Sequence, residues 1–280
     1  MRALLEYIRQ ELNQVTGPDE LEPFCRAICM ELLGISQTDY FLKTPVKLSG
    51  QQENTLRSAI RRLENGEPLQ YVLGSAPFCG LDFVVDRRVL IPRPETAELV
   101  GWILEDHTAA PKSVLDVGTG SGCIGITLSS RRPEWSVHAC DISEDALQVA
   151  RMNGQRNGVA VKFFTMDILD PLPGNGKYDI IASNPPYITE SEKVGMESNV
   201  LGHEPWLALF VPDGDPLKFY RAIAQYGRRT LNEGGCIYFE INPLYVSEMT
   251  VMLESLGYCD ILVKRDIFGK DRMIKAIYHE

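Results

Sequence analysis

A glycine-rich turn lies near the middle of the chain, in "LDVGTGSGCIG" (residues 115–125). The apolar residues before it predict a strand that ends near Asp116, and glycines follow at positions 118, 120 and 122. Glycine lets a backbone turn tightly and come within contact distance of a ligand. Farther on, "ACDIS" places Asp141 at the end of the next predicted strand, where its carboxylate can accept from both hydroxyls of a ribose. The pattern predicts a ligand that contains a nucleoside.

The glycines can be read in two registers. Gly120, Gly122 and Gly125 spell GxGxxG, the fingerprint of dinucleotide-binding oxidoreductases, but that match alone is weak. Asp116, Gly118, Gly120 and Gly122 spell DxGxGxG, which resembles the loop of S-adenosylmethionine-dependent methyltransferases and fits better. Asp141 serves as the ribose acceptor in either register.

Two further positions extend the predicted cofactor site. Asp167, in "TMDIL", follows the third predicted strand, where a carboxylate can accept from the amino group of an adenine, and Ile168 would flank the ring. Each aspartate also has a purely structural interpretation. Asp167 resembles a plain strand-end aspartate, and Asp141 could cap the helix "SEDALQVA", although Ser143 is better placed to do so.

The segment "IIASNPPYI" (180–188) ends a buried strand in a turn with few hydrogen-bond donors. A planar nitrogen delocalises its lone pair, so it attacks a methyl donor poorly. The Asn184 side-chain oxygen and the Pro185 carbonyl can accept both N–H groups of an NH₂, and thereby direct its lone pair and stabilise the positive charge that develops. Pro186 stiffens the turn, and Tyr187 offers an aromatic wall. The turn predicts methylation of a planar NH₂, with Asn184, Pro185 and Tyr187 as catalytic residues; a dinucleotide oxidoreductase has no use for it.

Three parts of the chain must position these residues. Residues 1–74 have helical periodicity: one helix is expected around Leu5 to Leu12, another over 18–33, and a third after a capping box at Ser49 and Gln52. Alternation over 78–91 predicts a β-hairpin linker within 75–92, with its turn at residues 86–88. From 93 to 280, a helix over about 95–107 and then alternating strands and helices predict an α/β domain with a mostly parallel sheet, closed by an antiparallel pair.

Composition argues against several classes of function. The net charge of −10, from 28 basic and 38 acidic side chains, argues against a broad nucleic-acid surface. Seven cysteines without a CxxC pair indicate reduced thiols in a cytoplasmic protein. We expect no membrane span, because no apolar stretch approaches the length that a bilayer requires, and no metal, because no metal-ligand spacing is apparent.

Four motifs together resemble one family: "VLIPRPETAELV", "DVGTGSG", "SNPPYI" and "EPWLAL". The chain is similar along nearly its whole length to the protein-(glutamine-N5) methyltransferases that modify peptide chain release factors. The resemblance implies a Rossmann-like, seven-stranded class I methyltransferase domain preceded by a small helical domain that recognises the substrate. It also implies a release factor as partner, whose glutamine in a GGQ tripeptide is methylated at its side-chain amide.

The resemblance also assigns site residues. It implies that Asn184, Asp141 and the glycine loop contact S-adenosylmethionine, the loop contributing Gly118, Thr119, Gly120, Ser121 and Gly122. The residues implied to hold the glutamine are Asn184, Pro185, Pro186 and Tyr187. One position departs from the family, which usually has glycine where "FEIN" has Asn242; this leaves the backbone path after the fifth strand open.

Other substrates remain as alternatives. A ribosomal-protein glutamine has the same amide. The exocyclic amine of a nucleic-acid base, such as N6 of adenine, needs the same two acceptors, and Tyr187 could stack on the flipped base. The acidic composition and the absence of a basic target-recognition segment disfavour the nucleic acid. A cofactor-binding protein without turnover is a further alternative, which the intact NPPY turn disfavours.

Overall fold

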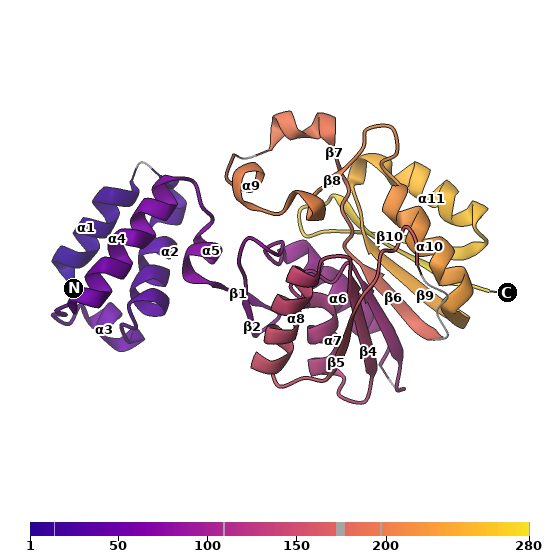
Figure 1. Cartoon of the computed structure of the whole chain (residues 1–280), viewed down its shortest axis with the longest axis horizontal. Coiled ribbons are helices and arrows are strands. Elements are labelled where there is room, and N and C mark those ends of the chain that lie inside the picture. The colour runs from indigo at the N-terminus through magenta and orange to yellow at the C-terminus, as the bar shows by residue number, and fades with distance from the viewer. Residues whose placement is uncertain (14, 109, 172–176, 197, 280) are drawn as a thin grey trace. The chain divides into compact units, whose positions relative to one another are not determined.

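The computed structural model describes residues 1–13, 15–108, 110–171, 177–196 and 198–279. These residues form two compact units (Figure 1). The first comprises Met1–Ser75 with Glu197–His203, and the second comprises Ala76–Met196 with Glu204–Glu280.

The first unit is helical, as its periodicity predicts. Its helices are α1 (Arg2–Leu12), α2 (Pro18–Ala27), α3 (Gln37–Leu42), α4 (Gly50–Glu64), α5 (Leu69–Leu73) and α9 (Ser198–His203). Leu5, Ile8 and Leu12 of α1 are buried in one apolar core with Ile60 of α4. The predicted capping box is confirmed: Gln52 N donates to Ser49 Oγ at 3.2 Å, and Ser49 N donates to Gln52 Oε1 at 2.9 Å.

The helix expected over 18–33 is present but not uniform. It changes after Ala27 into a π-helical turn, Ile28–Leu32, and Pro23 lies inside its α-helical part. The helix α9 comes from the segment after the NPPY turn, and its His203 Nε2 lies 3.2 Å from the carbonyl oxygen of Asn65. Residues far apart in the sequence therefore complete this unit.

The hairpin forms, but the turn expected at residues 86–88 does not connect its strands. Strands β1 (Ser75–Phe78) and β2 (Leu81–Val84) turn through Cys79 and Gly80, whose φ angles are +49° and +77°. Two consecutive residues with positive φ match the right-handed twist of a hairpin, and glycine adopts this conformation at no steric cost. Asp86–Arg88 make a separate turn, in which Val89 N donates to Asp86 O at 3.0 Å.

The second unit is built on a seven-stranded sheet with the order β10-β11-β9-β6-β3-β4-β5. Its strands are β3 (Ser113–Val117), β4 (Ser136–Asp141), β5 (Val161–Thr165), β6 (Tyr178–Ser183), β9 (Leu231–Glu240), β10 (Tyr258–Arg265) and β11 (Asp271–Tyr278). The first five are parallel, and β11 is antiparallel to both β9 and β10. The predicted parallel sheet and its closing antiparallel pair are confirmed.

Helices cover both faces of this sheet. Figure 1 shows α6 (Pro94–Asp106), α7 (Cys123–Arg131) and α8 (Glu144–Arg156) on one face. The other face is covered by α10 (Lys218–Thr230) and α11 (Val246–Ser255). Buried side chains of α10 and α11, including Tyr220 and Leu253, pack on Ile181 and Ile237 of the central strands. Because these strands are parallel, their carboxyl ends lie together at one edge of the sheet.

Short elements follow the NPPY turn. They are β7 (Ile188–Thr189), the 3₁₀ helices η2 (Glu190–Gly195) and η3 (Trp206–Ala208), and β8 (Phe210–Val211), which pairs in parallel with β7. A 3₁₀ turn, η4 (Pro243–Tyr245), follows β9. No helix in the described part of the chain is long and apolar enough to cross a membrane.

Candidate active site

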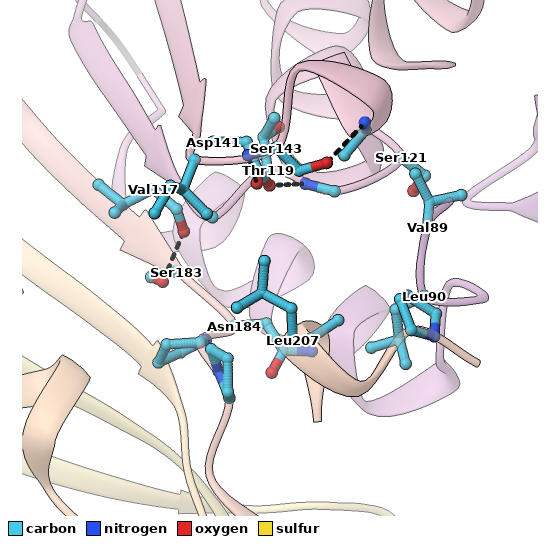
Figure 2. Close-up of a pocket in the computed structure, with 18 of the residues that line it drawn as sticks. Val89, Leu90, Val117, Thr119, Ser121, Asp141, Ser143, Ser183, Asn184 and Leu207 are labelled. Atoms are coloured by element: carbon cyan, nitrogen blue, oxygen red, sulfur yellow. Dashed lines mark hydrogen bonds between the residues drawn. The ribbon is translucent and has the colours of Figure 1, made fainter. Parts of the chain in front are cut away.

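A cavity of about 460 Å³ opens in the second unit at the carboxyl ends of β3, β4 and β6. Figure 2 shows Asp141 and Asn184 on opposite sides of it. It is lined by most of the residues predicted from the sequence: Gly118, Thr119, Gly120, Ser121, Asp141, Asp167, Ile168, Asn184, Pro185 and Pro186. Tyr187 and Gly122 are not part of the lining.

Hydrogen bonds from β4 and α8 hold the glycine loop in place. Thr119 N donates to Cys140 O at 2.9 Å, and the Ser121 carbonyl accepts from Asn153 Nδ2 at 2.9 Å. The buried Asn153 also exchanges two hydrogen bonds with Val84, so one amide joins the hairpin to the loop. Gly120 has a φ of +53°, and a Cβ there would point into space where no described atom lies within 4 Å. The loop therefore presents bare backbone to the cavity.

Asp141, the last residue of β4, has an oriented carboxylate. Its Oδ2 accepts from Gly120 N and its Oδ1 from Ser143 N, both at 2.9 Å. Burial raises the pKa of Asp141, and these backbone donors act against that rise. Ser143 itself caps α8 through Ala146 N at 3.2 Å, so Asp141 is not needed as the cap. Each carboxylate oxygen keeps lone pairs for a ligand hydroxyl.

Asp116 is fully buried beneath the loop. Its Oδ2 accepts from Thr119 Oγ1 at 2.6 Å and from Gly125 N at 2.9 Å, whereas Oδ1 has no hydrogen-bond partner among the described residues. Burial raises the pKa of Asp116 to about 6. The bare backbone at Gly120 fits a site for a ligand with polar groups, whereas Asp116 lies beneath the loop and does not line the cavity.

The predicted adenine contacts lie beyond the end of β5. Asp167 and Ile168 both line the cavity. Asp167 Oδ1 accepts from Leu169 N at 2.9 Å, a local turn contact that leaves Oδ2 available. The position of both residues agrees with the sequence expectation, and their roles stay predictions.

Asn184 follows β6 and is anchored by its amide nitrogen. Ser183, the last residue of the strand, donates from Oγ to Val117 O at 2.6 Å (Figure 2). Asn184 Nδ2 donates to Thr96 Oγ1 at 3.1 Å, and Thr96 Oγ1 donates to Glu240 Oε2 at 2.6 Å. Thr96 comes from the first turn of α6, and Glu240 ends β9. The side-chain oxygen of Asn184 accepts no hydrogen bond from the described residues, so it is available to a ligand.

Tyr187 is hydrogen-bonded to the carboxylate of Glu240. Its hydroxyl donates to Glu240 Oε1 at 3.0 Å. Burial, together with the charge of Glu240, raises the pKa of Tyr187 well above its ordinary value, so the hydroxyl stays protonated and donates. The ring packs beside the core between the sheet and α10. An aromatic wall facing a substrate, as the sequence suggested, remains a prediction.

Asn242, which departs from the family, has a defined role in this structure. Its φ of −73° does not require glycine. Its Oδ1 accepts from Leu244 N at 3.0 Å, and its Nδ2 donates to Tyr187 O and to the Glu192 carboxylate at 3.1 Å. The asparagine thus joins the backbone after β9 to the NPPY turn and to η2.

Four residues of this site were missed as functional candidates: Thr96, Asn153, Glu204 and Glu240. The buried Glu204 pairs with Arg93 and accepts from Ile91 N at 3.3 Å, so the "IPRPET" and "HEPWLAL" segments are joined directly. Polar residues inside otherwise apolar motifs were the available signal, because a buried polar group requires a partner.

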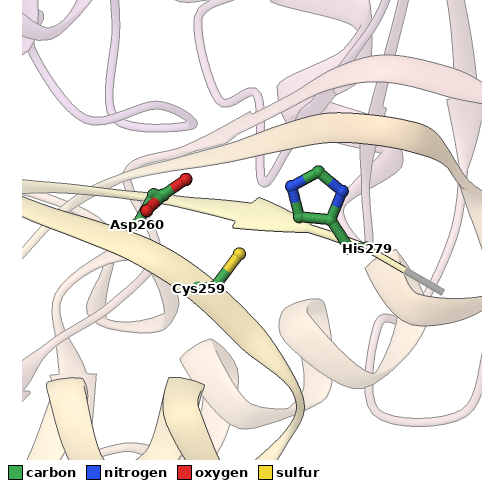
Figure 3. A group of neighbouring side chains, drawn as sticks. All are labelled: Cys259, Asp260 and His279. Atoms are coloured by element: carbon green, nitrogen blue, oxygen red, sulfur yellow. The ribbon is translucent and has the colours of Figure 1, made fainter.

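One group of possible metal ligands lies outside the cavity. Cys259, Asp260 and His279 place one donor atom each within 4.8 Å of one another (Figure 3). Antiparallel pairing of Cys259 with Ile277 brings these residues together, although His279 lies nineteen positions after Asp260 in the sequence. His279 Nδ1 also lies 2.7 Å from Glu233 Oε1.

Comparisons with known proteins agree with this architecture. Residues 97–201 match the family described as Methyltransferase small domain, and residues 3–74 match the PrmC N-terminal domain. A release factor glutamine methyltransferase of Bacteroides thetaiotaomicron is 48% identical over 278 residues, which cover 99% of each chain.

Solved structures share the fold. A methyltransferase from Pyrococcus furiosus gives a TM-score of 0.54 at 16% identity, over 83% of this chain and 100% of that chain. A T. thermophilus 16S rRNA methyltransferase in complex with AdoMet and guanosine gives 0.53 at 17% identity, over 73% and 50%. The second unit therefore has the fold of a methyltransferase.

Proposed function

Because the chain belongs to the release factor glutamine methyltransferases, we propose that its cavity binds S-adenosylmethionine beside an NPPY turn that holds the substrate amide. The substrate is the glutamine of the GGQ tripeptide in a peptide chain release factor, and the product carries a methyl group on the side-chain nitrogen, N5. The observation that carries this proposal is the position of Asn184: it lines the cavity, its amide nitrogen is already bonded to Thr96, and its oxygen is left to accept.

The fit of the cofactor rests on the cavity itself. The backbone of Gly118, Thr119, Gly120 and Ser121 borders it, Gly122 closes the turn behind them, and Asp141 offers two oriented oxygens to a ribose. Ile168 and Asp167 line the same cavity. In the proposed complex, Ile168 packs on the adenine ring and Asp167 accepts from its amino group. When bound, S-adenosylmethionine supplies an electrophilic methyl group on a positively charged sulfur.

The residues of the turn supply the remaining chemistry. A glutamine side-chain amide is a weak nucleophile because its lone pair is delocalised into the carbonyl. The Asn184 side-chain oxygen and the Pro185 carbonyl accept its two N–H groups, so the lone pair is directed out of the amide plane. The same two acceptors stabilise the positive charge that develops on nitrogen until one of its two N–H protons leaves to solvent. The two prolines hold these acceptors in place before the substrate arrives. Tyr187 and Pro186 complete the turn around the amide.

The remaining parts of the proposal concern partners. The first unit contains no reactive constellation among its described residues, and we assign it to recognition of the release factor. A release factor as substrate places the reaction in the cytoplasm, where translation ends. Ribosomal-protein glutamine and nucleic-acid amines are disfavoured as substrates, because the full-length relative is named for release factors.

A labelling experiment tests the proposal. The protein is incubated with methyl-labelled S-adenosylmethionine and, in separate reactions, with release factor, ribosomes or DNA. We expect label on the release factor alone, and mass spectrometry should place it on the glutamine of GGQ. Label on ribosomal protein or on DNA, with none on the release factor, would overturn the proposal.

A further inference from the structure

The carboxylate of Glu240 lies at the centre of the hydrogen bonds behind the NPPY turn, yet it does not line the cavity. Its side chain is almost fully buried, with 2% of the residue exposed. Oε2 accepts from Thr96 at 2.6 Å and Oε1 accepts from Tyr187 at 3.0 Å. A buried charge costs free energy unless it is hydrogen-bonded, so its presence beside a catalytic turn needs a reason.

The direction of each hydrogen bond follows from this carboxylate. An ionised carboxylate can only accept, so Thr96 must point its single hydroxyl hydrogen at Glu240. Thr96 Oγ1 then has only lone pairs to offer to Asn184, 3.1 Å away. The atom of Asn184 that faces Thr96 must therefore be the nitrogen, and the oxygen must face the other way.

We propose that Glu240 and Thr96 are positioning residues that fix the orientation of the Asn184 amide, so that its oxygen and not its NH₂ meets the substrate. This inference rests on the proposed function, because it assumes that Asn184 grips an NH₂ group. A reversed amide would point two donors at a substrate group that also donates. The hydrogen bonds from Glu240 through Thr96 to Asn184, called the Glu240 relay below, exclude that arrangement.

The Glu240 relay joins two motifs that are far apart in the sequence. Thr96 belongs to "IPRPET" and Glu240 to "FEIN", and 144 positions separate them. The parallel pairing of Ser183 with Phe239 brings the residues that follow, Asn184 and Glu240, to the same edge of the sheet. The N-terminal turn of α6 then supplies the hydroxyl between them.

Substitutions at Thr96 test the relay directly. Thr96→Val keeps the shape but cannot accept from Asn184, and Thr96→Ser keeps the hydroxyl. We expect Thr96→Val to lower the single-turnover rate of release-factor methylation by about 10- to 100-fold, since misplacing a reacting group has effects of this size. Thr96→Ser should react nearly as fast as wild type, and calorimetry should give both variants the wild-type affinity for S-adenosylmethionine.

Thr127→Val is a matched control. Thr127 is equally buried, in α7, and its hydroxyl has no partner among the described residues. The same substitution there should leave the rate unchanged. If Thr96→Val fails to bind the cofactor, Thr96→Ala replaces it, because it also lacks the hydroxyl and is well tolerated in a helix.

A double-mutant cycle separates orientation from general packing. Asn184→Asp has no amide to orient, and its carboxylate faces the lone pairs of Thr96. In that background Thr96→Val should cost nothing or increase the rate, whereas a packing role predicts the same loss in both backgrounds.

The relay is refuted if wild type methylates release factor while Thr96→Val reacts at the same rate, or if Thr96→Ser is as slow as Thr96→Val. If wild type itself does not methylate release factor, the proposed function fails instead, so the two failures are distinguishable.

Discussion

The hydroxyl of Tyr187 donates to the buried carboxylate of Glu240. The same carboxylate accepts from Thr96, whose hydroxyl oxygen accepts in turn from Asn184. The first and last residues of the NPPY turn are thus held by one acidic side chain from another strand. This arrangement gives Tyr187 a measurable influence on the reaction.

Replacing Tyr187 with Phe should shift the pH dependence of the rate. Burial raises the pKa of Glu240, and the hydrogen bonds from Thr96 and Tyr187 lower it; Glu95 raises it further and Arg272 lowers it. The ionised form holds the relay, so the rate should fall as the pH falls through this pKa. Tyr187→Phe removes one stabilising donor, so the pKa rises and the acid limb should move to higher pH. Single-turnover rates across pH measure this, and a limb that stays in place or moves to lower pH would contradict it.

Replacing Asp141 with Ala should weaken S-adenosylmethionine binding while the fold is retained. Each hydrogen bond to a charged acceptor contributes about 1.5–3 kcal/mol, and Asp141 has an acceptor for each ribose hydroxyl. Calorimetry measures the affinity. Ser143→Ala, which removes the side-chain cap of α8 but keeps the backbone N–H that donates to Asp141, is the control and should bind nearly normally. Unchanged affinity in a folded Asp141→Ala protein would reject the ribose role.

Replacing Asn184 with Ala should abolish most turnover but change cofactor binding little. It removes one of two acceptors for the substrate amide, and loss of such a contact costs about 10²–10³ in rate. Asn184→Asp keeps an acceptor of the same size, so we expect partial activity. Single-turnover methyl transfer at saturating cofactor compares the three proteins. If Asn184→Ala reacts like wild type, Asn184 does not hold the amide.

Replacing Asp116 with Asn should change how stability depends on pH. Burial raises the pKa of Asp116 to about 6, so its stabilising contribution is complete below its unfolded pKa near 3.8 and is lost as the pH rises through 6. Asparagine cannot ionise. The stability of Asp116→Asn relative to wild type should therefore increase by about 2 kcal/mol between pH 4 and pH 7. Denaturant unfolding at several pH values measures this, and a constant difference would show that Asp116 does not titrate in this range.

Local patterns predicted much of the fold. Each strand of the sheet was visible as a short apolar run, and Ser49 with Gln52 marked the start of α4, because periodicity and capping depend on neighbouring residues only. The hairpin turn was misplaced because the stronger polar signal at Asp86 outweighed the pair Cys79 and Gly80. The position of β11 between β9 and β10 is a long-range pairing, on which local patterns carry no information.

In the candidate site, too, local motifs were predicted from the sequence and long-range contacts were not. The glycine loop, Asp141 and the NPPY turn were predicted, because their motifs follow single strands. Thr96 and Glu240 act through contacts between segments far apart in the chain, and their sequence neighbourhoods indicate only helix and strand. A polar residue within each apolar motif indicated that a hydrogen-bond partner existed. It did not indicate which residue that partner was.

The division of the first unit between residues 1–75 and 197–203 affects its biogenesis. A nascent chain leaves the ribosome N-terminus first at about 5–20 residues per second, so α9 emerges on the order of ten seconds after α5. During that interval the carbonyl of Asn65 lacks the His203 ring that lies against it in the finished protein. Strands β3 to β6 are synthesised in the same interval. The helical unit can therefore be completed only after four of the seven strands of the sheet have been translated.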